Sequence, residues 1–522
     1  MLCQLLFSSL LFISLAVSQI DVNQALNQNK LDIGVISPSG ISDAELEQTF
    51  PRTNLARMRN ALKSLRQNWS AKLQAMPARN YGGVNQETGA AEQQKPLREK
   101  PRDRIKVEGD TLHQVNKAAG LNDILYQGDM VLTDLVIKSQ QFWKLSKTAP
   151  RRHRRERGDR LIAPKIVKAF EQAVAFWQNV TCINIIQSSS ALNRIRVFKG
   201  QGCYSYVGRI SGVQDLSLGT GCEEFGTAAH ELGHALGFFH TQSRYDRDNY
   251  ISINYANIDP SYVEQFDKET SSTNFNYGMP YDYGSIMQYG ATSASSNDKA
   301  TMMARDAEYQ DTMGSDFVGF YDISMMNEHY KCKELCPAGT SAQCVNGGFP
   351  SPRNCAICIC PSGYGGVLCD QRPPGCGDSL NATTAWQTIT NTIGDGLPTL
   401  RDNHTMCNYW VRAPDNQAVE IRISGLTTVT IDGCIFGGIE IKTNKDQKLT
   451  EYRAVTPSAD ATATSATTFA PIVNSCQDLH PNCAAYAWNG FCVNQFYSLQ
   501  ARHYYCAYTC GLCWMNYSNN QY

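Results

Sequence analysis

Three histidines and one glutamate in a short segment are the residues of this 522-residue chain best suited to catalysis. His230, Glu231, His234 and His240 lie within eleven residues, although the chain has only 9 histidines. On a helix, His230 and His234 share a face because they are four residues apart, and Glu231 reaches the same cleft. Gly237 lets the chain leave the helix and bring His240 round as a third ligand. Three nitrogens leave a fourth position for water, which predicts one catalytic Zn²⁺ per chain, with Glu231 as general base and acid in peptide-bond hydrolysis by zinc-bound water.

This segment matches the metzincin signature, and residues 285–289 (SIMQY) resemble the Met-turn of the astacin family. The resemblance implies an α+β protease domain, a twisted sheet with an active-site helix, over residues 158–332. It also implies that Met287 lies beneath the zinc ion. Tyr289 would be an additional, movable ligand that stabilises the oxyanion.

The chain before this domain is predicted to be removed in two steps. Residues 1–18 are almost wholly apolar and end in small residues, which predicts a cleaved signal peptide rather than a membrane anchor, and so a secreted, extracellular product. Residues 19–157 contain no cysteine and form a predicted propeptide, in which apolar residues from Leu55 to Met76 recur with a helical period. The arginine-rich run 151–157 predicts cleavage by a furin-like protease, the alternative being a plain basic patch.

A short stretch of the propeptide, Tyr126–Met130 (YQGDM), resembles the aspartate switch of astacin proregions. The resemblance implies that Asp129 binds zinc, displaces the water and keeps the zymogen inactive. The alternative is an ordinary Gly-Asp turn.

Three features of the sequence depart from the astacin pattern. Thr241 follows the third histidine where the family normally has a glutamate that helps to hold the new amino terminus. Only residues 158–164 separate the basic run from a helix predicted over 165–180, so the family's first strand is expected to be absent. Asp316 aligns with a segment whose arginine favours acidic residues just after the scissile bond in many members. Asp316 is therefore the candidate specificity residue, and it would repel acidic residues and tolerate neutral or basic ones.

All 20 cysteines except Cys3 fall between Cys182 and Cys513, which indicates disulfides formed in an oxidising compartment. Residues 333–370 resemble an EGF-like domain, 376–453 a truncated β-sandwich CUB domain, and 476–513 a ShK-like (ShKT) domain after a linker at 454–475. Within 376–453, alternating apolar residues at 419–423 and 439–442 predict strands.

The odd number of cysteines after Cys3 leaves Cys434 over, because the truncated CUB domain lacks its partner. The resemblances imply these disulfides: Cys182–Cys332, Cys203–Cys222, Cys336–Cys355, Cys344–Cys358, Cys360–Cys369, Cys376–Cys407, Cys476–Cys513, Cys483–Cys506 and Cys492–Cys510.

These features together predict a secreted zinc metalloendopeptidase, made as a zymogen, that acts on extracellular or matrix proteins. The resemblance to multidomain nematode astacins suggests cuticle collagens among the substrates, with matrix or glycan docking by the CUB and ShK-like modules. Nucleic-acid binding is not expected, because the net charge of the chain is −1. A membrane anchor is not expected either. The alternative is a catalytically impaired extracellular binding protein that acts through those modules. Glycosylation is expected at these sequons: Asn68, Asn179, Asn381, Asn403 and Asn516.

Overall fold

The computed structural model describes residues 2–6, 15–16, 50, 54–75, 105–106, 109–121, 124–131, 164–271, 274–394, 404–414 and 419–455, with a few single positions nearer the carboxyl end. The chain divides into two compact units, and every element named below belongs to the unit made of residues 1–391, 402–421 and 425–456. Across the described ranges, no helix combines the length and apolar character needed to cross a bilayer.

Two helices and a short strand precede the predicted protease domain and lie in residues 19–157, the predicted propeptide, which is called the pro-segment below: α3 (Leu55–Ala75), α4 (Leu112–Ala118) and β3 (Met130–Val131). The helical period predicted for the first of these is confirmed, and it buries Leu55, Met58 and Leu62 on one face. A capping box begins α4, because the Thr111 hydroxyl accepts from the Gln114 N–H and the Gln114 side chain accepts from the Thr111 N–H.

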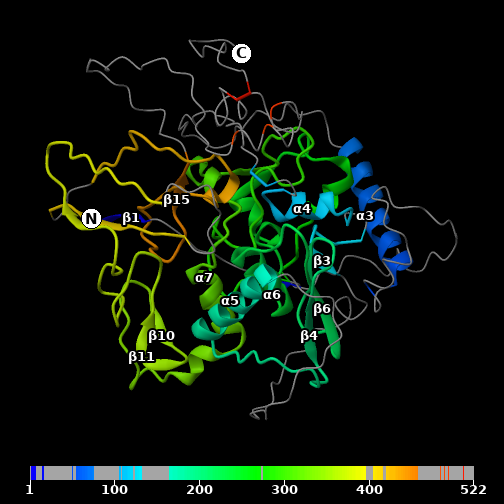
Figure 1. Ribbon diagram of the computed structural model, residues 1–522, viewed down its shortest axis with the longest axis horizontal. Coiled ribbons are helices and arrows are strands. Elements are labelled where there is room, and N and C mark those ends of the chain that lie inside the picture. Colours follow the sequence, from blue (N-terminus) through cyan, green and yellow to red (C-terminus); the bar gives the residue numbers. More distant parts are fainter. Residues whose placement is uncertain are drawn as a thin grey trace. The chain divides into compact units, whose positions relative to one another are not determined.

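In the core of the predicted protease domain, helix α5 packs against helix α6, and α6 packs against a four-stranded sheet (Figure 1). The sheet order is β3-β5-β6-β4, with β3 parallel to β5, β5 antiparallel to β6, and β4 parallel to β6. The pro-segment therefore supplies one edge strand of this sheet. The elements are α5 (Pro164–Val180), α6 (Phe225–Ala235), β4 (Arg194–Phe198), β5 (Cys203–Tyr206) and β6 (Val213–Leu218).

α5 carries its apolar residues on one face and buries them against α6, as its helical period predicts. Ile166, Ala169, Ala173 and Trp177 are all buried. The indole N–H of Trp177 donates to the carbonyl oxygen of Ala229 on α6 (3.2 Å), so this large ring is buried without an orphaned donor. The packing fixes the orientation of the helix that carries the first two histidines.

Short elements complete the domain after α6. β7 (Ile251–Ile253) pairs with β9 (Met302–Ala304), and β8 (Asn274–Phe275) pairs with β2 (Leu15–Ala16). The last helix, α7 (Phe320–His329), is buried over most of its length. The disulfide Cys182–Cys332 joins the end of α5 to the chain just after α7.

Two further sheets follow. β10 (Phe349–Ser351) and β11 (Asn354–Ile359) form a hairpin. The other sheet has the order β12-β13-β1-β14-β15, formed by β12 (Ser379–Asn381), β13 (Asn408–Arg412), β1 (Leu2–Leu6), β14 (Ile439–Lys442) and β15 (Tyr452–Ala454).

The five-stranded sheet tests two sequence predictions. The strand predicted at 439–442 is confirmed as β14, whereas the strand predicted at 419–423 is wrong, because these residues lie outside any strand. β1, which lies within the predicted signal peptide, occupies the position between β13 and β14 and pairs with both. Both neighbours thus have partners on each side, and residues 419–423 pair with none of the described strands.

Candidate zinc centre

The three histidines converge in a buried cluster. α6 presents His230 and His234 on one face, and its C-terminal turn ends at Gly237, whose φ of +114° is a conformation that glycine adopts without strain. The chain then turns back to place His240 beside them. The ring centroids lie 4.6 Å apart for His230 and His234, and 4.8 Å apart for His234 and His240.

Hydrogen bonds orient each imidazole so that Nε2 faces the cluster. Nδ1 of His230 lies 2.5 Å from the carbonyl oxygen of Ile286, and Nδ1 of His234 lies 2.6 Å from that of Phe238. Nδ1 of His240 lies 3.2 Å from Oε1 of Gln127, a residue of the pro-segment. Because a carbonyl oxygen only accepts, each Nδ1 carries the proton and each Nε2 offers a lone pair.

Asp129 of the pro-segment lies between the three rings. Its Oδ2 is 3.2 Å from Nε2 of His230 and 3.1 Å from Nε2 of His240, and its Oδ1 is 3.5 Å from Nε2 of His234. The Tyr289 hydroxyl donates to the same carboxylate (2.7 Å). The aspartate and the three histidines are buried, and their ligand atoms lie within 4.8 Å of one another.

The residues present fit a zinc ion. Nε2 of His234 and Oδ1 of Asp129 are buried, and neither makes a hydrogen bond within the described ranges. Such orphaned polar atoms are costly unless they bind something, and three imidazoles with one carboxylate form a donor set that Zn²⁺ favours. One zinc ion held by His230, His234 and His240, with Asp129 as the fourth ligand, would satisfy these atoms.

The protonation states also suit a metal ion. Burial lowers the pKa of His234 to about 4 and lowers that of His240, so both rings are neutral at pH 7. Burial opposes ionisation of Asp129, but the charge interactions with His240 and His234 outweigh it and hold the pKa of Asp129 well below its usual range. A carboxylate among neutral rings is the deprotonated ligand set that metal binding requires.

Glu231 follows the first ligand on α6 and is fully buried. Neither of its carboxylate oxygens has a hydrogen-bond partner within the described ranges. Burial, together with the charge of Asp129, raises the pKa of Glu231 well above its usual range. A bound dication acts in the opposite direction and favours the carboxylate.

Met287 and Thr241 connect the segment 230–240, which carries the three histidines, to the turn at residues 285–289. Met287 is fully buried, and its carbonyl oxygen accepts from the Thr241 N–H (3.0 Å). The Thr241 hydroxyl lies 2.5 Å from that of Ser285, and Oε1 of Gln242 accepts from the Tyr289 N–H (3.1 Å). The residue that replaces the family glutamate thus ties His240 to the turn that carries Tyr289.

The pro-segment contacts the chain after residue 164 at several places besides Asp129. β3 pairs with β5, where the Ser205 N–H donates to the carbonyl oxygen of Asp129 (3.1 Å). The Asn116 amide on α4 donates to the carbonyl oxygens of Gly128 (2.8 Å) and Cys203 (2.6 Å). Gln127 contacts Ser243 (2.8 Å) in addition to His240. The roles of Asn116 and Gln127 were not predicted, because their partners lie far away in the sequence.

The other predicted sites are distributed over the first unit or lie outside the described residues. Asp316 lies in the cleft that contains His230 and Tyr289. The Cys434 thiol is buried, 3.6 Å from the carbonyl oxygen of Asp311, and forms no disulfide with a cysteine of the described ranges. Of the sequons, Asn179 is exposed on α5 and Asn381 is exposed on β12, Asn68 lies within α3, and Asn403 and Asn516 lie outside the described residues.

The disulfides of the structure are the pairs that the family resemblances implied: Cys182–Cys332, Cys203–Cys222, Cys336–Cys355, Cys344–Cys358, Cys360–Cys369, Cys376–Cys407 and Cys492–Cys510. Cys483 is disulfide-bonded. The pair Cys476–Cys513 and the partner predicted for Cys483 lie outside the described residues.

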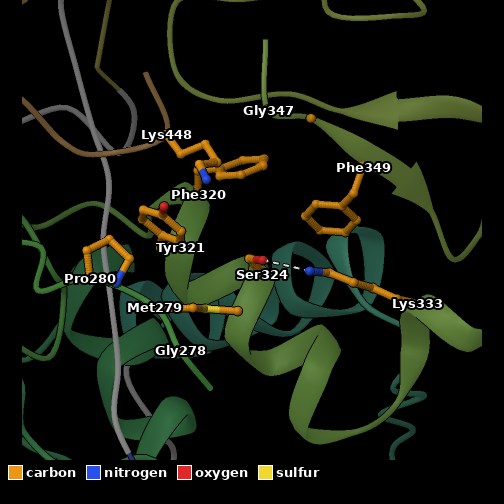
Figure 2. Close-up of a pocket in the computed structure, with 11 residues that line it drawn as sticks. Gly278, Met279, Pro280, Phe320, Tyr321, Ser324, Lys333, Gly347, Phe349 and Lys448 are labelled. Carbon is orange, nitrogen blue, oxygen red and sulfur yellow. Dashed lines mark hydrogen bonds between the residues drawn. The ribbon is translucent and has the colours of Figure 1, made fainter. Parts of the chain in front are cut away.

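A second cavity, of about 340 Å³, lies away from the histidines, between α7 and the loop before β10 (Figure 2). Two lysines line it, but both are already paired with nearby acidic groups. Lys333 donates to Ser324 and Glu328 (2.8 Å each), and Lys448 lies 3.4 Å from Asp446. The ammonium groups of both lysines therefore already have partners in the structure.

Comparison with known proteins agrees with the geometry. Residues 159–331 match the family model Astacin, which describes a family of peptidases, and residues 475–513 match the ShK domain-like model, which confirms the predicted ShK-like domain. The chain is 73% identical to zinc metalloproteinase nas-31 of Caenorhabditis elegans over 100% of this chain and 95% of that protein. It is 38% identical to zinc metalloproteinase nas-32 of the same species, over 66% of this chain and 54% of that protein.

Among solved structures, the chain is similar to high choriolytic enzyme 1, a hatching enzyme zinc-protease from the medaka fish Oryzias latipes. The identity is 34%, the match covers 32% of this chain and 84% of that chain, and the TM-score is 0.31. The alignment with nas-31 spans 588 positions, more than the 522 residues here, so that relative contains residues that this chain lacks. Similarity over the full chain to a zinc metalloproteinase, together with a histidine site that fits one zinc ion, shows that this chain belongs to the astacin family of zinc metalloproteinases.

Proposed function

We propose that the protein is a secreted endopeptidase, made as a latent zymogen, that hydrolyses extracellular or matrix proteins after its pro-segment is removed. The observation that carries this proposal is the position of Asp129, which reaches all three histidines and Tyr289 from the pro-segment. While Asp129 is there, it occupies the place that a water molecule and a substrate carbonyl need. Asp129 therefore contributes to latency both sterically and electrostatically.

Removal of the pro-segment would expose the machinery for hydrolysis. A bound zinc ion supplies an acidified water and polarises the scissile carbonyl. Glu231, fixed on α6 beside the ligands, accepts the proton of the attacking water and delivers it to the leaving amine. The Tyr289 hydroxyl, released from Asp129, donates to the substrate oxygen as negative charge develops there.

The edge of β5 is a natural platform for the substrate backbone. In the zymogen this edge is covered by β3. Once β3 leaves, an extended peptide can take its place and satisfy the same backbone groups, since strand addition is a common mode of peptide recognition. This arrangement favours unfolded or extended protein segments as substrates.

The modules after the protease domain support an extracellular role. The disulfides of residues 333–370 join the first cysteine to the third, the second to the fourth and the fifth to the sixth, which supports an EGF-like domain. The short strands and the disulfide Cys376–Cys407 support a CUB-like domain. We assign matrix or glycan docking to the CUB-like and ShK-like modules.

Controlled activation tests the proposal. The intact chain is expected not to hydrolyse quenched peptides. Cleavage within residues 151–157 is expected to produce peptide hydrolysis that a zinc chelator abolishes. The physical reason is that Asp129 leaves only when the pro-segment is detached. A cleaved, zinc-loaded chain that hydrolyses no peptide would instead favour a binding protein that acts through its docking modules.

A further inference from the structure

A partly buried ion pair outside the metal ligands joins the pro-segment to the start of the active-site helix. Lys106 Nζ lies 2.5 Å from Oε2 of Glu224, the N-cap residue of α6, and the Lys106 side chain is only 14% exposed. The backbone N–H groups of Ile105 and Lys106 both donate to the Asp110 carboxylate (2.9 Å each), which fixes the direction of the lysine. The lysine is therefore held in a formed pocket.

Asp316 and Phe436 lie near the Lys106 ammonium group. A Cβ atom on Gly226 would lie 2.5 Å from the carbonyl oxygen of Asp316, so only glycine allows Asp316 to pack this closely against the first turn of α6. The ring centroid of Phe436 lies 5.7 Å from Lys106 Nζ, within the range of a cation–π interaction. Glu224, Asp316 and Phe436 are defined here as the basic-residue pocket.

The electrostatics of the pocket favour a cation. Burial alone lowers the pKa of Lys106, but the charges of Asp316, Glu224 and Asp110 outweigh burial and raise the pKa above its usual value. Asp110 belongs to the pro-segment and leaves with it. Glu224 and Asp316 stay behind on the protease domain as two acidic side chains without Lys106.

Lys106 favours the carboxylate form of Asp316, so its departure favours the neutral acid, and a cationic side chain that takes its place favours the carboxylate again. Burial and the charge of Glu224 raise the pKa of Asp316 to about 7, while Lys106, His230 and Arg453 act in the opposite direction. Arg453 is already paired, since its Nε lies 3.0 Å from Glu440.

The two acidic side chains of the basic-residue pocket line the catalytic cleft. One cavity of about 60 Å³ is lined by Lys106, Glu224 and Asp316 together with His230 and Tyr289. Glu224 precedes His230 by six positions on or beside α6, which corresponds to about 9 Å along the helix. An extended peptide advances about 3.3 Å per residue, so this distance spans about three residues.

We propose that the basic-residue pocket selects a lysine or arginine side chain of the substrate within about three residues of the scissile bond, and that Lys106 occupies the pocket as its surrogate in the zymogen. This inference rests on the proposed proteolytic function and names the substrate class of the same site. It also sharpens the expectation for Asp316, from tolerance of basic residues to preference for them.

A matched peptide series tests the proposal on the activated full chain. Quenched peptides of one sequence carry Lys, Gln or Glu at each of the three positions on either side of the scissile bond. At one position, kcat/KM is expected to be about tenfold or more higher for Lys than for Gln, and lower still for Glu, because a partly buried charged hydrogen bond forms only with Lys. The double substitution Glu224→Gln with Asp316→Asn is expected to abolish the Lys-to-Gln ratio.

The substitution Glu223→Gln is the control. It removes one carboxylate next to Glu224, at a side chain that accepts from the Gly221 N–H and does not line the cleft, and the ratio is expected to persist. The same peptides are also titrated by fluorescence anisotropy against the activated Glu231→Gln chain, where about tenfold tighter binding of the Lys peptide is expected without any turnover.

The outcomes separate the two proposals. Zinc-dependent cleavage with equal rates for Lys, Gln and Glu at every position would overturn the pocket and leave the proteolytic function standing. Absence of cleavage for every peptide would overturn the proteolytic function. The anisotropy titration then decides the pocket by itself, and equal affinities there would reject it.

Discussion

Glu231→Gln is expected to lower kcat/KM of the activated chain about 10³-fold, within the range that general acid–base catalysis contributes. The substitution keeps the size of the side chain and removes the charge that accepts the proton. Glu231 lies on α6 beside His230, and its two oxygens have no hydrogen-bond partner in the described ranges that an amide would disturb. Steady-state kinetics with a quenched peptide measures the loss.

Two measurements show that such a loss is catalytic. Metal analysis of the variant is expected to give one zinc ion per chain, since all three histidines remain. Glu223→Gln, the same substitution at a residue outside the cleft, is expected to retain the activity of the unmodified chain. Unchanged turnover by the Glu231→Gln chain would contradict the assigned role. Loss of zinc along with activity would mean that Glu231 supports the structure of the metal site and would also contradict the role in proton transfer.

Asp129→Asn is expected to make the uncleaved chain active, with hydrolysis at least about tenfold above that of the intact unmodified chain. An amide is neutral and a poorer zinc ligand than a carboxylate, and it cannot form the charge-assisted hydrogen bond with Tyr289. The block is expected to weaken without vanishing, because β3 and Asn116 still hold the pro-segment on β5.

Lys117→Ala is the matched control within the pro-segment. Lys117 makes an ion pair with Asp259 on the protease domain, but at the surface, where such pairs contribute little. The uncleaved Lys117→Ala chain is therefore expected to stay silent. An equally silent Asp129→Asn chain, folded and zinc-loaded, would show that latency comes from the broad packing of the pro-segment and not from Asp129.

Features that depend on short-range spacing could be predicted from the sequence. The helical repeat places His230 and His234 on one face, and a glycine that adopts positive φ turns the chain toward His240, so the ligand cluster follows from one local segment. The apolar periods of α3 and α5 likewise predict those helices with little error at either end.

Features that depend on distant contacts could not be predicted. Gln127 orients His240, and Lys106 fills a pocket beside Asp316, across separations of more than 100 residues that no local pattern encodes. The strand wrongly predicted at 419–423 has the same cause. Its alternation is genuine, but a strand needs a partner, and residues 419–423 pair with none of the described strands.

A zinc titration of the activated, metal-free chain tests the central claim most directly, namely that one zinc ion held by His230, His234 and His240 makes this chain a protease. Peptide hydrolysis and bound zinc are measured on the same samples as zinc is added back. We predict no hydrolysis without metal, and a rise that follows bound zinc and reaches its plateau at one ion per chain. Hydrolysis by the metal-free chain, or a chain that binds one zinc ion and remains inactive, would contradict the claim.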